Sequence, residues 1–286
     1  MNHYIPQGEG IKLFSPAKLN LFFRVLNKRP DGFHEIASLY QAINLADILH
    51  VCLSDEDRLT CNEPGIPSDS SNLVWKAIGS FRKNTAKNFK VHVHLQKNIP
   101  VQSGLGGGSS NAATALWAVN QLLGRIVAEE DLRAFASEFS SDAPFFFSTG
   151  TAYCCGRGEI LEAVPPLQPQ SLWIAKPMDG LSTPLVYKYC QPEKFLGRNP
   201  RDFLYQILEG REAFFNDLEI PAFQLMPSLQ RLKEKLQSLG FSSVTMTGSG
   251  TAFFCVGATS QAPVLEGIQF TPVQYLNRLE GKWYEK

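Results

Sequence analysis

The chain has 286 residues, of which 44% are hydrophobic and 20 are phenylalanine. This is the composition of a globular protein with an ample core, long enough for two modest domains or one large one. The 27 basic residues balance the 27 acidic ones, so no overall field favours a nucleic acid or a membrane surface. An anionic ligand would therefore need positive charge gathered locally.

The cysteines and the first residues bear on the compartment. The six cysteines show no Cys-x-x-Cys spacing, which argues against a zinc knuckle or a redox motif. Residues 1–12 lack the basic start and apolar core of a signal peptide, and no apolar run approaches the length of a membrane span. We expect a cytoplasmic protein with reduced thiols.

Four segments before residue 97 are predicted to form helices or strands. They are one or two strands over 11–27 interrupted at Pro16, a strand pair over 39–53, a helix over 72–83 and a strand over 89–95. In the last of these, apolar residues alternate with polar ones, among them His92 and His94. Two histidines do not fill a metal site, so we interpret both as surface polar residues.

A glycine-rich stretch follows, between that strand and a predicted helix over 111–123 with Ser109 or Ser110 as its cap. Glycines let backbone N–H groups crowd an anion, and a helix start adds unpaired donors, so the stretch predicts a phosphate site. It matches neither the Walker pattern, which needs a lysine after the last glycine, nor the Rossmann pattern. Its residues are Pro100, Val101, Gln102, Ser103, Gly104, Leu105, Gly106, Gly107, Gly108, Ser109 and Ser110.

The second half mixes both kinds of element. The pattern predicts a helix over 131–139, a buried strand over 145–147, a strand over 172–175, a helix with Leu229, Leu232, Leu236 and Leu239 on one face ended by Gly240, and strands over 242–246 and 252–256. The proline-rich segment 164–169 is the best domain boundary, giving domains 1–164 and 165–286. The fold class is α+β.

Three short signals are weak when each is taken alone. Lys18 lies in an otherwise apolar strand and, at period two, shares a face with Asn20. Most such lysines lie on the solvated face of an edge strand. Asp142 lies between small residues and Pro144, where turn aspartates are common. The residues 247–250, Thr-Gly-Ser-Gly, read as a hairpin turn or as a close backbone approach to a ligand.

Together, and in this order, these segments resemble the GHMP small-molecule kinases over nearly the whole chain. The carrying segments are Ser-Pro-Ala-Lys-Leu-Asn-Leu at 15–21, Arg-Pro-Asp-Gly-Phe-His-Glu at 29–35, the stretch 100–113, Ser-Asp-Ala-Pro-Phe-Phe at 141–146, Asn-Asp-Leu-Glu at 216–219 and Thr-Gly-Ser-Gly at 247–250. The longer glycine run and the Asp-Gly-Phe-His segment are similar to one branch of that family. Its members phosphorylate the 2-hydroxyl of a methylerythritol joined to cytidine diphosphate, on the non-mevalonate route to isoprenoid precursors.

The resemblance implies a two-domain α+β kinase fold. Its N-terminal domain would hold the phosphate loop and the catalytic residues, its C-terminal domain would be ferredoxin-like, and the active site would lie in the cleft between them. ATP would be the co-substrate and would bring Mg²⁺, with no dedicated protein metal ligands. The expected partners are ATP and the cytidyl diphosphate substrate, with no nucleic acid and no membrane, and the chain would be a monomer or weak homodimer.

By the same resemblance, Asp142 accepts the proton of the acceptor hydroxyl and Lys18 lies beside both. The ATP-binding residues would be the stretch 100–110 together with Asn72 near the adenosine. The substrate-binding residues would be Asn20 at the erythritol end, Phe33 and Tyr187 stacking on the base, His34 at the cytosine edge, Thr183 near the diphosphate, and Thr247 and Gly248.

Two alternatives remain open from the sequence. One is another kinase of the same family, acting on mevalonate, homoserine or a sugar, which would not need aromatic residues for a base. The other is a non-catalytic nucleotide-sensing protein of the same fold, which would be expected to lack the lysine and the aspartate.

Overall fold

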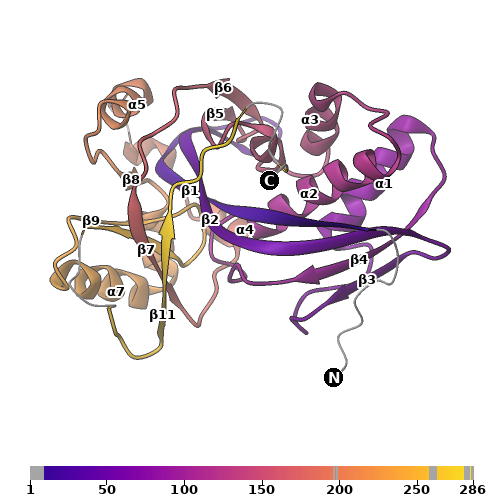
Figure 1. The fold of residues 1–286 in the computed structure, drawn as a ribbon. Coiled ribbons are helices and arrows are strands. Elements are labelled where there is room, and N and C mark those ends of the chain that lie inside the picture. Colours follow the sequence, from indigo (N-terminus) through magenta and orange to yellow (C-terminus); the bar gives the residue numbers. More distant parts are fainter. Residues whose placement is uncertain (1–9, 196, 198, 258–262, 280–283, 285–286) are drawn as a thin grey trace.

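The computed structural model describes residues 10–195, 197, 199–257, 263–279 and 284. Within them the chain forms a seven-stranded and a four-stranded sheet with helices packed on both (Figure 1). The first sheet has the order β3-β4-β2-β1-β8, with β5 on β2 and β6 on β5. Its strands are β1 (Ile11–Lys28), β2 (His34–Ser54), β3 (Arg58–Cys61), β4 (Lys90–Gln96), β5 (Thr151–Gly156), β6 (Ile160–Ala163) and β8 (Phe215–Asn216).

The spine of this sheet is the long antiparallel hairpin of β1 and β2. Strand β1 continues through Pro16, because a register shift between Pro16 and Ala17 accommodates the missing N–H. The strand pair predicted over 39–53 is wrong, since β2 is one strand of 21 residues. It stays continuous because β5 pairs with its first half and β4 with its second half along the same edge.

Helices cover one face of the first sheet and enclose its core. They are α1 (Leu73–Thr85), α2 (Gly107–Leu122), α3 (Glu129–Ser137) and the 3₁₀ helix η1 (Ala143–Phe147). The helix predicted over 72–83 is confirmed as α1, with Asn72 as its N-cap. The strand predicted over 145–147 is wrong, because these phenylalanines lie in η1, although they are fully buried as expected.

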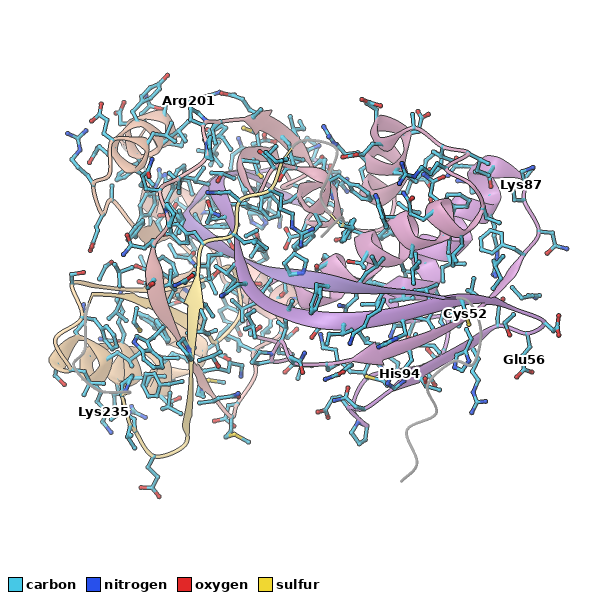
Figure 2. The ribbon with its side chains drawn as sticks, in the orientation of Figure 1. Cys52, Glu56, Lys87, His94, Arg201 and Lys235 are labelled. Carbon is cyan, nitrogen blue, oxygen red and sulfur yellow. The ribbon has the colours of Figure 1, made fainter. Side chains whose placement is uncertain are left out.

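The interpretation of His92 and His94 as surface residues is also wrong. Their exposed fractions are 6% and 7%. Strand β4 is an interior strand between β2 and β3, so side chains from both neighbours cover its polar face. The His94 ring contacts the Thr60 hydroxyl at 2.8 Å and lies 6.2 Å from the ring of His50; Figure 2 labels His94 on this part of the sheet.

The second sheet has the order β11-β7-β10-β9 and confirms the strands predicted in the last third of the chain. Of the four leucines predicted on one helix face, three are buried, whereas Leu239 at the helix end is 36% exposed. The elements are β7 (Ser171–Pro177), α4 (Thr183–Lys188), η2 (Pro192–Phe195), α5 (Pro200–Leu208), α6 (Glu219–Leu225), α7 (Pro227–Ser238), β9 (Ser243–Met246), β10 (Phe253–Val256) and β11 (Ile268–Gln274).

The two sheets are linked at more than one point. The proline-rich segment 164–169 connects β6 to β7, yet β8 pairs in parallel with β1 and so belongs to the first sheet. After β11 the chain returns to the first sheet, where Tyr275 bridges to Ile43 and Tyr284 packs into the helix-covered core (Figure 1). The domain limits 1–164 and 165–286 stay a prediction. No helix among the described residues is long and apolar enough to cross a membrane.

Candidate active site

A cavity of about 940 Å³ lies between the first sheet, the glycine-rich stretch and residues of the second half of the chain. Both halves contribute to its wall, because α4 and residues 248–249 face β1 and the start of α2. The predicted site residues on the wall are Lys18, Phe33, His34, Asn72, residues 100–109, Asp142, Thr183, Tyr187 and Gly248. Asn20, Ser110 and Thr247 are fully buried behind this wall.

Lys18 and Asp142 meet on one side of the cavity although 124 positions separate them in the sequence. The lysine Nζ lies 3.3 Å from Asp142 Oδ2 and donates to Asn20 Oδ1 at 2.7 Å. The side chain of Lys18 is 4% exposed and that of Asp142 is 29% exposed, so the carboxylate is the more accessible partner. Strand β1 places the amine, and the bend before η1 places the carboxylate.

Tyr40 completes this group and was not found from the sequence. Its ring lies under the Lys18 ammonium, 4.5 Å away, and its hydroxyl donates to Asp142 Oδ1 at 2.9 Å. Burial, and then the nearby Asp142 carboxylate, raise the pKa of Tyr40 well above its ordinary value. The hydroxyl therefore remains a donor at all physiological pH values and fixes one oxygen of the carboxylate, which leaves Oδ2 toward Lys18.

The wall of the cavity concentrates the positive charge that the chain as a whole lacks. Among the described residues, five cationic side chains and one carboxylate, that of Asp142, line it; the cationic side chains are Lys18, Lys28, Lys97, Arg157 and Lys188. Two of the five are also paired with carboxylates that are not on the wall, Lys97 with Asp47 and Arg157 with Glu159. An excess of basic groups in a concave site attracts anions by summed Coulomb attraction at low local dielectric. The cavity is thus suited to a ligand with several phosphate charges.

The glycine-rich stretch ends at the start of α2, but not with the predicted serine cap. The N-cap is Gly106, in the left-handed region with φ 71°, and it makes no side-chain cap hydrogen bond. A Cβ on Gly106 would lie 3.0 Å from Lys18 Cγ, which is why glycine suits this position. Without a cap, the first N–H groups of the helix are left for an anion in the cavity.

Ser109 and Ser110, predicted as caps, lie inside the first turn of α2, and their hydroxyls bind neighbouring segments instead of capping the helix. Ser109 Oγ accepts from Ser140 Oγ at 2.8 Å, and Ser110 Oγ accepts from Ser15 Oγ at the same distance. These bonds join the start of α2 to the segment before Asp142 and to β1 respectively. The two serines therefore help to hold the glycine-rich stretch against the strand that carries Lys18 and the bend that carries Asp142.

A buried carboxylate, which the sequence did not single out, fixes the residues directly before the glycine-rich stretch. Asp47 is fully buried and accepts from the backbone N–H groups of Asn98 and Ile99 at 2.7 and 2.8 Å. Its other oxygen pairs with Lys97 Nζ and accepts from Asn111 Nδ2. One carboxylate thereby ties the segment before the loop to the helix after it.

The turn at 247–250 packs directly on the glycine-rich stretch. A Cβ on Gly104, at φ 83°, would lie 2.0 Å from the carbonyl oxygen of Thr247, and a Cβ on Gly250 would lie 2.0 Å from the carbonyl carbon of Ser103. Only residues without a side chain permit this approach of two backbones. The Thr247 hydroxyl accepts from the Asn20 N–H at 3.0 Å, so the turn also contacts β1, the strand that carries Lys18.

The far end of the cavity brings together the residues predicted for a base. The rings of His34 and Tyr187 lie 5.2 Å apart, whereas the 53%-exposed Phe33 has the Arg157 guanidinium 5.0 Å from its ring. Burial, followed by the charge of Lys28, lowers the pKa of His34, so the imidazole is neutral near pH 7. Thr183 hydrogen-bonds Ser249 at 2.7 Å.

Asn72 also lies on the wall of the cavity and caps α1, accepting from Val74 N–H at 2.9 Å and donating to Pro67 O at 2.7 Å. Both polar groups of the Asn72 side chain are therefore already bound to backbone atoms. Backbone groups next to Asn72 contribute to the polar surface of the wall here as well as the side chain. Among the described residues there is no group of three acidic, histidine or cysteine side chains placed to hold a metal ion.

Comparison with known proteins defines the class. The profile of the GHMP kinases N terminal domain matches residues 72–150, and that of the GHMP kinases C terminal domain matches residues 204–268. A solved homoserine kinase from Cytophaga hutchinsonii has the same fold, with a TM-score of 0.70 at 18% identity over 98% of this chain and 99% of its own.

Proteins of higher sequence identity are all kinases of one kind. The 4-diphosphocytidyl-2-C-methyl-D-erythritol kinase of Protochlamydia amoebophila is 47% identical over 96% of this chain and 93% of its own length. The chloroplastic enzyme of that name from Arabidopsis thaliana is 40% identical over 96% and 76%. A crystal structure of 4-(cytidine 5'-diphospho)-2C-methyl-D-erythritol kinase superposes with a TM-score of 0.79 at 32% identity, over 93% of this chain and all of its own. The chain therefore belongs to the GHMP kinase family and, within it, to the 4-diphosphocytidyl-2-C-methyl-D-erythritol kinases.

Proposed function

We propose that this chain transfers the γ-phosphoryl group of ATP to the 2-hydroxyl of 4-diphosphocytidyl-2-C-methyl-D-erythritol, a step in isoprenoid precursor synthesis by the non-mevalonate route. The observation that carries the proposal is the meeting of Lys18 and Asp142 in one cavity with the uncapped start of α2. Phosphoryl transfer needs an aligned acceptor, stabilised phosphate charge and a late proton acceptor, and these groups can supply all three.

On the acceptor side, Asp142 is the proposed proton acceptor and Lys18 the group that polarises the hydroxyl oxygen. The carboxylate is partly exposed to the cavity while the ammonium is buried behind it. The ammonium, 3.3 Å from the carboxylate, would stabilise the alkoxide character that develops as the proton leaves. Asn20, bound to the Lys18 amine, would orient both toward the erythritol end.

On the nucleotide side, residues 100–110 and Asn72 are the proposed ATP site. The N–H groups of the first turn of α2 and the cationic wall would stabilise the triphosphate. Mg²⁺ would accompany the nucleotide; since the described residues offer no acidic cluster, phosphate oxygens and waters would supply most of its ligands. When bound, the metal would supply neutralisation of the charge that develops on the transferred group.

At the far end, Phe33, His34, Thr183, Tyr187, Thr247 and Gly248 are the proposed contacts of the cytidyl diphosphate. A neutral His34 can both donate to and accept from a cytosine edge. Stacking of a base on an exposed aromatic ring such as Phe33 stabilises a complex by about 1–3 kcal/mol. A ligand without a base would leave this end of the cavity unused.

We also propose that the chain folds as two domains meeting near residue 164, and that it acts in the cytoplasm as a monomer or weak homodimer without nucleic acid or membrane. The support for a reducing compartment is that the six cysteines are all unpaired thiols. Sedimentation at micromolar concentration tests the oligomeric state.

A substrate comparison tests the proposed function. Purified protein with ATP and Mg²⁺ is assayed with 4-diphosphocytidyl-2-C-methyl-D-erythritol, mevalonate and homoserine, and the product is identified by ³¹P NMR. Phosphorylation of the cytidyl compound alone supports the proposal. ATP consumption with mevalonate or homoserine but not with the cytidyl compound rejects it.

A further inference from the structure

The segment Asn-Asp-Leu-Glu at 216–219 begins at the last residue of β8 and lies outside the wall of the cavity, yet three of its side chains bind elements that form the site. Asp217 accepts from the Arg24 guanidinium and from the N–H of Val25, and so holds the end of β1. Glu219 Oε1 accepts from the N–H of Met246 at 2.9 Å, directly before the turn at 247–250.

Asn216 makes the most direct contact with that turn. Its Nδ2 donates to the carbonyl oxygens of Met246 and Gly248, each at 2.7 Å, and its Oδ1 accepts from the N–H of Leu218 at 2.9 Å. These three bonds use both amide hydrogens and the oxygen, so only this orientation of the amide fits. Asn216 is 5% exposed, and water therefore cannot replace the bonds if they are lost.

The turn that Asn216 holds is the point where the second half of the chain contacts the reacting end of the cavity. The Thr247 hydroxyl accepts from the Asn20 N–H, and a Cβ on Gly248 would lie 3.2 Å from Asn20 Oδ1. That same Oδ1 accepts from the Lys18 ammonium. A displaced turn would therefore move the partner of the catalytic amine.

We propose that Asn216 is a positioning residue for phosphoryl transfer, which acts by holding the 247–250 turn against Asn20 and the phosphate loop. Gly248 is at φ 57°, and neither Gly248 nor Gly250 has a side chain that could pack and fix the turn. The conformation of the turn therefore depends on hydrogen bonds from neighbouring elements. Asn216 bonds two carbonyls of this segment from the first sheet, because β8 is paired with β1.

The test compares Asn216→Asp with Asn216→Ala, and rests on the proposed function for its substrate. At pH 8 we expect both variants to lower kcat/KM for the cytidyl substrate by about 10- to 100-fold, the loss that unsatisfied buried carbonyls produce. In Asn216→Asp a carboxylate oxygen faces two carbonyls, which raises the pKa of the introduced carboxyl. As the pH falls toward 6, this group protonates and regains one donor.

Asn216→Asp should therefore be the worse variant at pH 8 and the better one at pH 6, and a merely structural role would not produce this reversal. The matched control is Asn120→Asp, because Asn120 is another buried asparagine that bonds backbone groups, those of Val127, away from the cavity. It should lose stability and keep wild-type kcat/KM per folded molecule.

At pH 8, a loss of kcat/KM smaller than about tenfold per folded molecule in either variant of Asn216 would overturn the proposal, as would equal pH profiles for the aspartate and alanine variants. If the aspartate variant does not fold, the alanine variant decides: a loss of about tenfold or more per folded molecule supports the role, and a smaller one refutes it. A wild type that fails to phosphorylate the cytidyl compound would reject the proposed function. An active wild type beside an unimpaired alanine variant would reject only this inference.

Discussion

Tyr40→Phe removes one hydroxyl and keeps the aromatic ring under the Lys18 ammonium. The hydroxyl donates to Asp142 Oδ1 at 2.9 Å, and a hydrogen bond to a charged group stabilises by about 1.5–3 kcal/mol. Because the Asp142 side chain is 29% exposed, water can partly replace the lost donor, so the lower end applies. We expect kcat to fall roughly tenfold, since about 1.4 kcal/mol corresponds to a factor of ten.

The assay is rapid-quench single turnover with saturating ATP, so that the phosphoryl-transfer step is measured apart from product release. The matched control is Tyr205→Phe, which removes a hydroxyl from a tyrosine that is 57% exposed, and it should leave the rate unchanged. A Tyr40→Phe enzyme with the wild-type rate would refute the reasoning, because the carboxylate would then need no third group to orient it.

The same variant carries a pH prediction. The pKa of Tyr40 is raised in the folded chain by burial, whereas a tyrosine in the unfolded chain ionises near its reference pKa of about 10. The unfolded state therefore loses this proton first, and the free energy of unfolding contributed by Tyr40 is present below pH 10 and declines above it. Thermal unfolding midpoints should fall less between pH 9 and 11 in Tyr40→Phe than in wild type; an equal or steeper fall would contradict this.

Three further predictions follow from the phosphate loop and the base end. Gly106 is at φ 71°, so Gly106→Ala should destabilise the folded protein by about 1–2 kcal/mol and weaken binding of a non-hydrolysable ATP analogue. The control Gly79→Ala, where a Cβ meets open space, should do neither. Calorimetry of both variants measures the unfolding and the binding. Asp47→Asn leaves the Lys97 ammonium unpaired and should destabilise by about 3–5 kcal/mol in urea unfolding; a loss below about 1 kcal/mol would count against the network. Since the pKa of His34 is lowered from its ordinary value, cytidine affinity should stay nearly constant from pH 8 to 7, and a clear decline over that interval would show that the imidazole becomes charged.

Much of the fold was predictable because its signals are local. Apolar alternation predicted β4, and the leucine spacing predicted α7, since burial of one face follows directly from period. The strand predicted at 145–147 failed because three phenylalanines are compatible with any buried element, and Pro144 favours a short 3₁₀ turn here. Long-range pairing is what kept β2 whole, and no window along the chain contains that information.

The candidate site divides in the same way. Lys18, Asp142 and the glycine stretch could be named because their residue types and order match a known family, and the structure brings them to one cavity. Tyr40 and Asp47 could not be named from the sequence. A tyrosine or an aspartate in a long strand gives no sign of its role until the fold places Asp142 beside Tyr40 and residues 98–99 beside Asp47. Asn216 had a signal in the Asn-Asp-Leu-Glu segment, but its partners lie 30 residues away.

The most direct test of the account is the single-turnover rate of Asp142→Asn, measured together with its affinity for a non-hydrolysable ATP analogue. The variant keeps the size of the side chain and removes the proposed proton acceptor, whose carboxylate lies 3.3 Å from the Lys18 amine. The account predicts a rate lower by about 10²–10⁴-fold with nucleotide affinity retained. A rate within a few-fold of wild type would contradict the assignment of Asp142 and, with it, the proposed chemistry of the cavity.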